Sequence, residues 1–351
     1  MSTNLRVGIL GVGTAAAGHA HAYAQLPDVT INALWNRTKT KAETFAGKLN
    51  QSDLQIYDHW ESLIENVEID VLSITTGEFL RREPVVAALE RGLHVLVEKP
   101  YSIALEDAIA MTAAAQHRNT ISAISLNWRY APGVQLAWRG LREGWIGHML
   151  DIQQSWRFRG SPRSMQEWLP WATEEITLLA GGGSHEFDRA RFLTGCEFVR
   201  LVGAVHTVTY SKEPEFIMPG AYSLVAELTG GLWGDFRLTI TTGQPAWTLV
   251  VNGEEGTLEV AHDRVFLRQA DDKEQRSIEV PVADQKPDGV PMIQHTWDQL
   301  IADFVKAIRK GDRSATPHLP TLTDALRGQE VIAAAELAAA EQRWVAIQEM
   351  R

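Results

Sequence analysis

The segment 95–100 carries the side chains of this chain that are best suited to do chemistry, because Glu98 and Lys99 follow three apolar residues directly and precede Pro100. Residues 85–94 have the pattern of a helix that ends near Gly92, and the apolar residues after it are too few for anything but a buried strand. In an open α/β sheet, ligands bind at the carboxyl ends of the strands. We therefore expect Lys99 to emerge in a binding crevice.

A second pattern, GxGxxA, begins at Gly11, directly after the first predicted strand and at the start of a predicted helix. Gly11 permits a tight turn, and Gly13 lets the backbone approach a pyrophosphate. The helix N-terminus, at Thr14 and Ala15, then provides an anion-binding site. Because the pattern stands in this context, it predicts dinucleotide binding.

The residues after the second strand bear on the choice of coenzyme. No acid stands at the tip of this strand, where NAD-binding proteins usually carry one. Asn36, Arg37 and Thr38 could instead bind a ribose hydroxyl or the additional phosphate of NADP. The sequence therefore favours NADP over NAD. The alternative, that Arg37, Lys39 and Lys41 only form the solvated start of a helix, leaves NAD open.

The first part of the chain alternates short apolar segments with helical ones, which indicates a Rossmann fold with a doubly wound parallel sheet. The predicted strands are 5–10, 30–35, 55–57, 70–74, 94–97 and 121–124, and the predicted helices include 40–49 and 105–117. We expect an NAD(P)-binding domain at residues 1–125.

Longer alternating strands follow, which predict an α+β domain with an open, mostly antiparallel sheet. The predicted strands are 152–157, 201–210, 223–228, 232–241, 248–251 and 257–260. Turns are predicted at 230–231 and 252–253, and helices at 295–310 and 322–346. We expect residues 126–351 to bind substrate and to form a homodimer or homotetramer through the sheet, with the last helices packing back toward the first domain.

Four motifs, in this order and spacing over almost the whole chain, resemble the glucose-fructose oxidoreductase, inositol dehydrogenase and rhizopine catabolism (Gfo/Idh/MocA) family. They are Gly11-x-Gly13, Glu98-Lys99-Pro100, Asn127-x-Arg129-Tyr130-x-Pro132 and Gly183-Ser184-His185-Glu186-Phe187-Asp188. The resemblance implies a Rossmann domain followed by a domain with an open, mostly antiparallel sheet. It also implies NAD(P)-dependent oxidation or reduction of a sugar, an inositol, a cyclic diol or a sugar acid.

The resemblance further implies roles for individual residues. Lys99 would hydrogen-bond the reacting oxygen, His185 would exchange its proton, and Glu98 would help to place Lys99. Alternatively, His185 could have only a structural role at the start of a helix that Ser184 and the preceding glycines begin. The predicted cofactor contacts are Gly11, Gly13, Thr14, Ala15, Asn36, Arg37, Thr38, Thr75, Thr76, Glu98, Lys99 and Asn127.

The chain departs from the family pattern at three places, of which one is mild: Ala16 stands for the final glycine of the fingerprint. Gly181 stands where many members have an aspartate four residues before the histidine. Gly77, Glu78 and Arg81 align with a proline, an asparagine and a histidine of relatives, in a loop beside the cofactor. Gly181 favours an alternative function, a non-catalytic sugar sensor that keeps the cofactor site, whereas the intact segment 98–100 favours an enzyme. An elimination that proceeds through transient oxidation is a third possibility.

The segment before His185 is rich in tryptophan and arginine. Aromatic faces stack on sugar rings, although tryptophans also fill cores. The arginines could clamp a carboxylate, or they could face water beside neighbouring glutamates. The candidate substrate contacts are Arg129, Trp156, Arg157, Trp168 and His185.

Composition excludes several classes of protein. A net charge of -11 and a pI near 5.5 argue against a nucleic-acid partner. A single cysteine excludes an internal disulfide or a multi-thiolate metal site, and the histidines show no metal-ligand spacing. Because no apolar run could span a bilayer and little precedes the first strand, we expect a cytoplasmic protein of two domains with no membrane partner and no metal.

Overall fold

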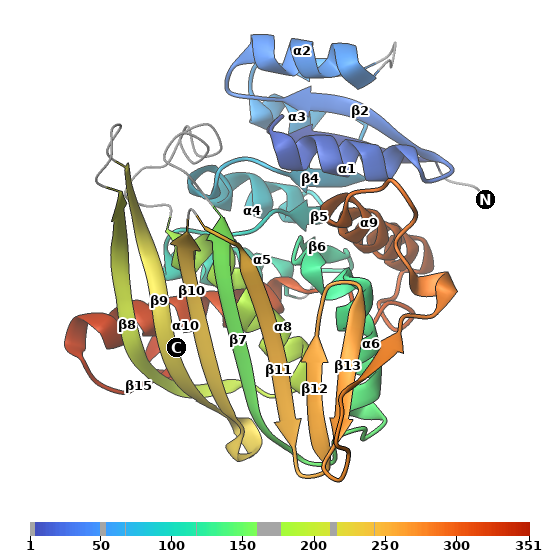
Figure 1. Cartoon of the computed structure of the whole chain (residues 1–351). Coiled ribbons are helices and arrows are strands. Elements are labelled where there is room, and N and C mark those ends of the chain that lie inside the picture. The colour runs from blue at the N-terminus through green and yellow to red at the C-terminus, as the bar shows by residue number, and fades with distance from the viewer. Residues whose placement is uncertain are drawn as a thin grey trace. The chain divides into compact units, whose positions relative to one another are not determined.

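The computed structural model describes residues 4–49, 54–66, 68–116, 118–159, 177–210, 216–241 and 243–351. The chain forms two compact units (Figure 1). The first comprises Met1–Tyr130 and Gly289–Leu326, and the second comprises Ala131–Asp288 and Arg327–Arg351. The first unit is thus assembled from two separate parts of the chain.

The first unit contains a six-stranded parallel sheet in the order β3-β2-β1-β4-β5-β6. Both faces of its central strands are buried, which explains why these strands are almost continuously apolar. The strands are β1 (Leu5–Leu10), β2 (Val29–Trp35), β3 (Gln55–Tyr57), β4 (Val71–Ile74), β5 (His94–Val97) and β6 (Ser122–Ile124). The predicted Rossmann sheet is confirmed.

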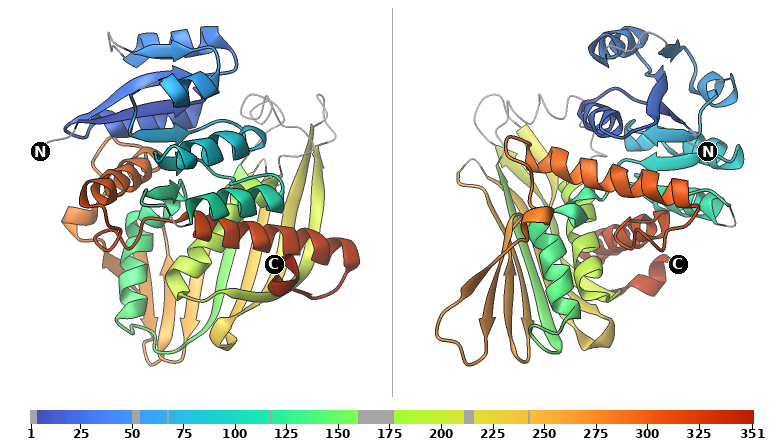
Figure 2. Two further views of the ribbon diagram at one scale, coloured as in Figure 1. Left: turned by 180° about the vertical axis from the view of Figure 1, so that it is seen from behind. Right: turned by 90° about the vertical axis from the view of Figure 1, so that its right-hand side faces the viewer.

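Two clusters of buried apolar side chains hold helices to this sheet, one on each face. One cluster includes α1, α2 and α9, and the other includes α3, α4 and α5. Figure 2 shows α9 running beside α1. The helices are α1 (Thr14–Ala24), α2 (Lys39–Leu49), α3 (Trp60–Asn66), α4 (Arg82–Glu90), α5 (Leu105–Ala115) and α9 (Met292–Lys310), with the short turns η1 (Glu78–Leu80) and η2 (Asn127–Tyr130).

The second unit contains a nine-stranded sheet in the order β14-β13-β12-β11-β7-β10-β9-β8-β15. Its neighbouring strands are antiparallel except β7 and β10, which confirms the mostly antiparallel sheet. The strands are β7 (Met149–Arg159), β8 (Phe198–Tyr210), β9 (Phe216–Leu228), β10 (Trp233–Thr241), β11 (Ala246–Gly253), β12 (Gly256–Val260), β13 (Arg264–Gln269), β14 (Arg276–Glu279) and β15 (Val345–Ala346). The sequence pattern did not predict β13, β14 and β15.

Helices α6 (Pro132–Arg142) and α8 (Ser184–Thr194) lie on one face of this sheet (Figure 2). The predicted helix 322–346 is too long, because α10 (Leu322–Glu341) ends before Gln342, whose φ of 53° is left-handed. The residues after it pair with β8 as β15. None of the described helices is long and apolar enough to cross a membrane.

Alternation along β10 separates its side chains onto two faces of the sheet. Phe236 and Leu238 are buried on the face that α8 and the turn before it cover. Trp233, Asp235 and Arg237 lie on the opposite face and are exposed. The outer face of the sheet therefore mixes apolar and charged side chains, and the apolar half of the alternation belongs to the core.

Candidate functional site

The carboxyl ends of the parallel strands bring most of the predicted residues of the first unit to one edge of its sheet. Gly11 follows β1, Asn36 follows β2 and Thr75 follows β4. Lys99 and Asn127 lie just after β5 and β6. The order of strands reverses between β1 and β4, which is the position where open α/β sheets bind their ligands.

The loops after β1 and β4 pack tightly against each other at Gly11. This residue has a φ of +93°, and a Cβ there would lie 2.8 Å from the backbone of Thr75 and Thr76. The Thr75 hydroxyl donates to the carbonyl oxygens of Leu10 and Gly11, at 3.0 Å each. Glycine is required here both by conformation and by space.

The N-terminus of α1 fits the pyrophosphate of a dinucleotide. Gly13 is exposed, and a Cβ built there meets no described atom within 4 Å. In the described part of the chain, no side chain caps this helix end and no acid stands in its first turn. The first backbone N–H groups, including those of Thr14 and Ala15, are therefore available to an anion.

The predicted coenzyme-selecting residues form one turn after β2. The Asn36 amide donates to the carbonyl oxygen of Thr38 at 3.0 Å, and Arg37 is exposed. Lys39 is held by Asp58 at 2.9 Å. Asn36, Arg37 and Thr38 therefore lie together in one turn directly after β2.

Glu98, which is 4% exposed, is the centre of a buried hydrogen-bond network. His19 Nε2 lies 3.0 Å from Glu98 Oε1, and Trp297 Nε1 donates to the same oxygen at 3.2 Å. The backbone N–H of Lys99 donates to Glu98 Oε2 at 3.0 Å, and His19 Nδ1 lies 2.8 Å from Ser73 Oγ. The carboxylate therefore joins β5 to α1 and α9.

These donors decide the charge of Glu98. Burial by itself raises the pKa of a carboxyl, but the hydrogen bond and charge of His19, with Lys99 nearby, hold the pKa of Glu98 below its ordinary value. Glu98 is consequently ionised at neutral pH.

Sequence reasoning missed the part that His19 and Trp297 play in this network. His19 shares a helix face with Ala16 and Tyr23, and this spacing was a signal that it is buried. No local pattern marks Trp297, which lies 199 residues after Glu98. A Cβ at Gly18 would lie 2.2 Å from the indole, so glycine at this position lets Trp297 approach α1.

Lys99 follows β5 and precedes a cis peptide bond to Pro100. Burial lowers the pKa of the Lys99 ammonium; Glu98 opposes this effect, and the positive charge of Arg81 adds to it. A lysine with a lowered pKa exchanges protons more readily near neutral pH than an exposed one does.

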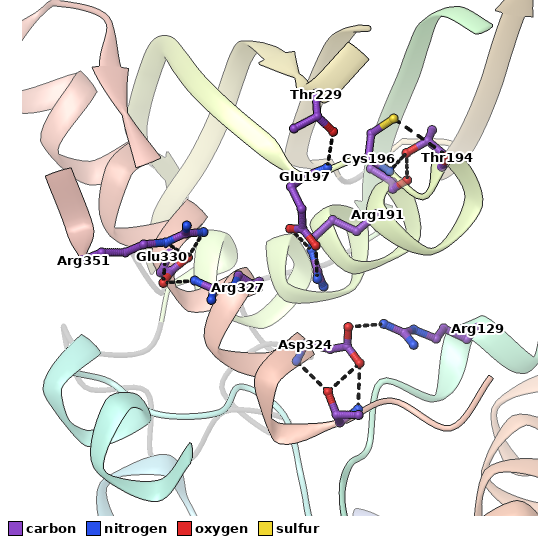
Figure 3. Close-up of polar contacts among 12 residues, drawn as sticks. Arg129, Arg191, Thr194, Cys196, Glu197, Thr229, Asp324, Arg327, Glu330 and Arg351 are labelled. Atoms are coloured by element: carbon purple, nitrogen blue, oxygen red, sulfur yellow. Dashed lines mark hydrogen bonds and ion pairs between the residues drawn. The ribbon is translucent and has the colours of Figure 1, made fainter. Parts of the chain in front are cut away.

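Two more predicted residues of the first unit have partners within that unit. The Asn127 amide donates to Thr296 Oγ1 at 2.7 Å. The Arg129 guanidinium pairs with Asp324 at 3.3 Å (Figure 3). Both side chains are buried, and both join the Rossmann segment to the later part of the chain.

In the second unit, His185 is buried at the second position of α8. A π-helical turn, Leu179–Gly183, runs directly into this helix, and Ser184 Oγ donates to the carbonyl oxygen of Gly181. His185 therefore lies within a longer helical segment. A Cβ at Gly181, one turn earlier on the same side, meets no described atom within 4 Å, so the position has room for a side chain.

A buried polar cluster lies next to His185. Tyr222 Oη donates to Glu186 Oε2, and Gln154 Nε2 donates to the carbonyl oxygen of Glu186 at 2.7 Å. Arg189 Nε donates to Gln154 Oε1 at 3.2 Å. Burial raises the pKa of Glu186 to about 7, although Arg189 and Tyr222 act against this rise.

The remaining candidates for substrate contact differ in position. Trp156 lies on the inner face of β7, where a Cβ at Gly182 would be 3.6 Å from its ring. Arg157 is exposed on the opposite face, because successive side chains of a strand alternate. Trp168 lies outside the described residues. Among those that are described, no group of three or more His, Cys, Asp or Glu could hold a metal ion.

Comparison with known proteins agrees with this architecture over most of the chain. Residues 5–125 match a family model described as "Oxidoreductase family, NAD-binding Rossmann fold". Residues 134–259 match the GFO/IDH/MocA C-terminal domain. The chain belongs to the Gfo/Idh/MocA family. Membership confirms the predicted class of enzyme, an NAD(P)-dependent oxidoreductase.

Several proteins named as sugar dehydrogenases are similar to the chain. Levoglucosan dehydrogenase of Pseudarthrobacter phenanthrenivorans is 28% identical over 74% of this chain and 69% of its own. D-apiose dehydrogenase of Paraburkholderia graminis is 26% identical over 73% and 67%. A levoglucosan dehydrogenase structure with NADH and levoglucosan gives a TM-score of 0.85 at 23% identity, covering 98% of this chain and all of that one. This last likeness bears on the fold alone.

The Glu186 cluster leads to a prediction about stability. Because the native state holds the Glu186 proton up to about pH 7, against an ordinary pKa of 4.5, its contribution to stability falls as pH rises through this interval. Glutamine stays neutral. We therefore expect the free energy of unfolding of Glu186→Gln, relative to wild type, to rise by roughly 2 to 3 kcal/mol between pH 5 and pH 8. Urea denaturation at both pH values measures this difference. An equal pH dependence for the two proteins would show that the carboxyl is not perturbed.

Proposed function

We propose that this protein transfers hydride between a nicotinamide coenzyme and a carbinol or carbonyl carbon of a sugar, an inositol, a cyclic diol or a sugar acid. The observation that carries the proposal is the position of Lys99, with its pKa lowered, at the β5 end of the dinucleotide-binding edge. The relatives named as dehydrogenases of levoglucosan and apiose support a sugar-like substrate.

The first unit would hold the coenzyme through Gly11, Gly13 and the N-terminus of α1, with further contacts from the loops after β2, β4 and β6. When bound, the coenzyme supplies the carbon that accepts or donates the hydride. The chain itself orients the reacting oxygen and handles its proton.

Lys99 would act on the reacting oxygen. During oxidation the neutral Lys99 amine would accept the hydroxyl proton, and the ammonium that forms would stabilise the negative charge that develops on the oxygen as hydride leaves. During reduction the ammonium would return this proton to the oxygen. The ionised carboxylate of Glu98 would keep Lys99 in place through its backbone N–H.

His185 would exchange the proton further, as the family resemblance implies. The second unit would also supply Trp156, on the inner face of β7, as an aromatic contact for a sugar ring. Arg157 lies on the outer face of that strand, so it does not share a face with Trp156.

Substitution of Lys99 tests its role in turnover. We expect Lys99→Met to lose roughly 100- to 10,000-fold in turnover, because a positioned proton carrier contributes about this factor. Coenzyme binding, followed by fluorescence of the reduced nicotinamide, should persist. The measurement is reduced nicotinamide formed from NADP or NAD with pooled aldoses, inositols, sugar acids and cyclic diols.

Lys48→Met, at the exposed end of α2, is the matched control and should keep wild-type turnover. If wild type binds coenzyme tightly but reduces none of it with any pool, one of two alternatives would replace the dehydrogenase proposal. They are the non-catalytic sugar sensor and an elimination through transient oxidation, in which the coenzyme is reoxidised before release. Analysis of the products would separate those two.

We also propose that the coenzyme is NADP. Arg37, exposed beside Asn36 and Thr38, would bind the additional phosphate. Arg37→Gln should then raise KM for NADP by roughly ten- to a hundred-fold, the value of a charge-assisted hydrogen bond, and leave KM for NAD nearly unchanged. Arg91→Gln is the control, because Arg91 follows α4 and precedes β5, at the opposite edge of the sheet. Equal effects on both coenzymes would refute the assignment.

We propose that two or four copies associate through the outer face of the second unit's sheet. Val225 and Trp233 are 38% and 44% exposed there, beside Asp235 and Arg237. Such a mixed surface resembles a non-obligate interface more than a buried core. Light scattering of the purified protein should give the mass of a dimer or tetramer, and a monodisperse monomer would exclude both.

A further inference from the structure

Arg81 is a buried arginine in the first unit that the proposed mechanism does not use. It lies between η1 and α4 and is 3% exposed. Its Nε and Nη2 donate to the carbonyl oxygen of Thr76 at 3.0 and 2.7 Å. Its Nη1 donates to the carbonyl oxygens of Glu98 and Pro100.

These acceptors lie on both sides of Lys99. The guanidinium binds the residue before Lys99 and the residue after it, and so fixes the backbone from which the lysine side chain extends. The same planar group binds Thr76, in the loop that packs against Gly11. The planar guanidinium of arginine can donate to three carbonyl oxygens at once. The compact ammonium of a lysine cannot direct its donors to the same three positions.

Arg81 also acts on Lys99 through its charge. Glu98 and Glu78 attract the ammonium, and Arg81 repels it. The positive charge of Arg81 therefore counteracts the attraction of the two glutamates for the Lys99 ammonium. Because Arg81 is buried, solvent ions screen this repulsion less than they would at the surface. If Arg81 acted only through its contacts with the carbonyl oxygens, a neutral side chain that kept those contacts would leave the proton affinity of Lys99 unchanged.

We propose that Arg81 is a positioning residue for Lys99: it holds the end of β5 in register with the Thr75–Thr76 loop and adds a like charge beside the ammonium. The inference rests on the proposed function of Lys99, because it assigns Arg81 no contact with substrate. It predicts two separable effects, one on geometry and one on proton affinity.

The experiment titrates Lys99 itself. Protein labelled with ¹³C at lysine Cε is followed by NMR against pH without substrate, and Lys99→Met assigns the signal. Arg81→Gln should raise the pKa of Lys99 by roughly one unit, because a nearby like charge is lost. It should also lower kcat by roughly ten- to a hundred-fold through misplacement of the lysine.

Arg81→Lys separates the two effects. It retains the charge and should keep the pKa of Lys99 near that of wild type, but kcat should still fall because the planar guanidinium is lost. Arg82→Gln is the matched control: Arg82 is exposed and pairs with Asp107, so both readouts should stay at wild-type values.

A folded Arg81→Gln protein with the wild-type Lys99 pKa and kcat would overturn the inference. If that variant does not fold, Arg81→Lys decides, and wild-type kcat in it would refute the positioning role. Should wild type show no turnover with any substrate, the NMR titration still tests the effect of Arg81 on Lys99, so failure of the proposed function and failure of this inference are distinguishable.

Discussion

The buried carboxylate of Glu98 is the constraint on which the rest of the dinucleotide edge depends. An ionised group in the interior is costly unless donors surround it, and removal of one partner leaves an uncompensated charge. The donors come from α1, α9 and the backbone after β5. The charge of Glu98 is compensated only when α9 packs beside α1, although these helices are distant in sequence. Gly18 leaves the space in which Trp297 approaches α1.

A second buried acid, Glu186, shows what the same residue type does with fewer donors. Tyr222 donates to one of its oxygens, and Glu186 Oε1 has no hydrogen-bond partner among the described residues. Burial then dominates, and the pKa of Glu186 rises to about 7, whereas that of Glu98 is held low. The number and charge of the donors, rather than depth of burial, separate the two carboxyls.

Much of the site could be predicted because its residues follow strands directly. The glycines at 11 and 13, the turn at 36–38 and the pair at 98–99 all lie at the ends of predicted strands, and parallel strands share an edge. Arg81 and Trp297 could not be assigned in this way. Their partners are backbone carbonyls and a carboxylate that only the packing of loops and helices brings near.

The sequence by itself determined the parallel and mostly antiparallel sheets, because hydrophobic periodicity reports local geometry and the burial of each face. It also located the glycine turn and Lys99. Tertiary structure alone decided which face of β10 is covered, that residues 345–346 leave the helical pattern to pair with β8, and that His19, Trp297 and Arg81 surround the segment of Lys99. These features depend on contacts between residues far apart in sequence, and a local pattern can indicate that a residue such as His19 is buried but not which partner it meets.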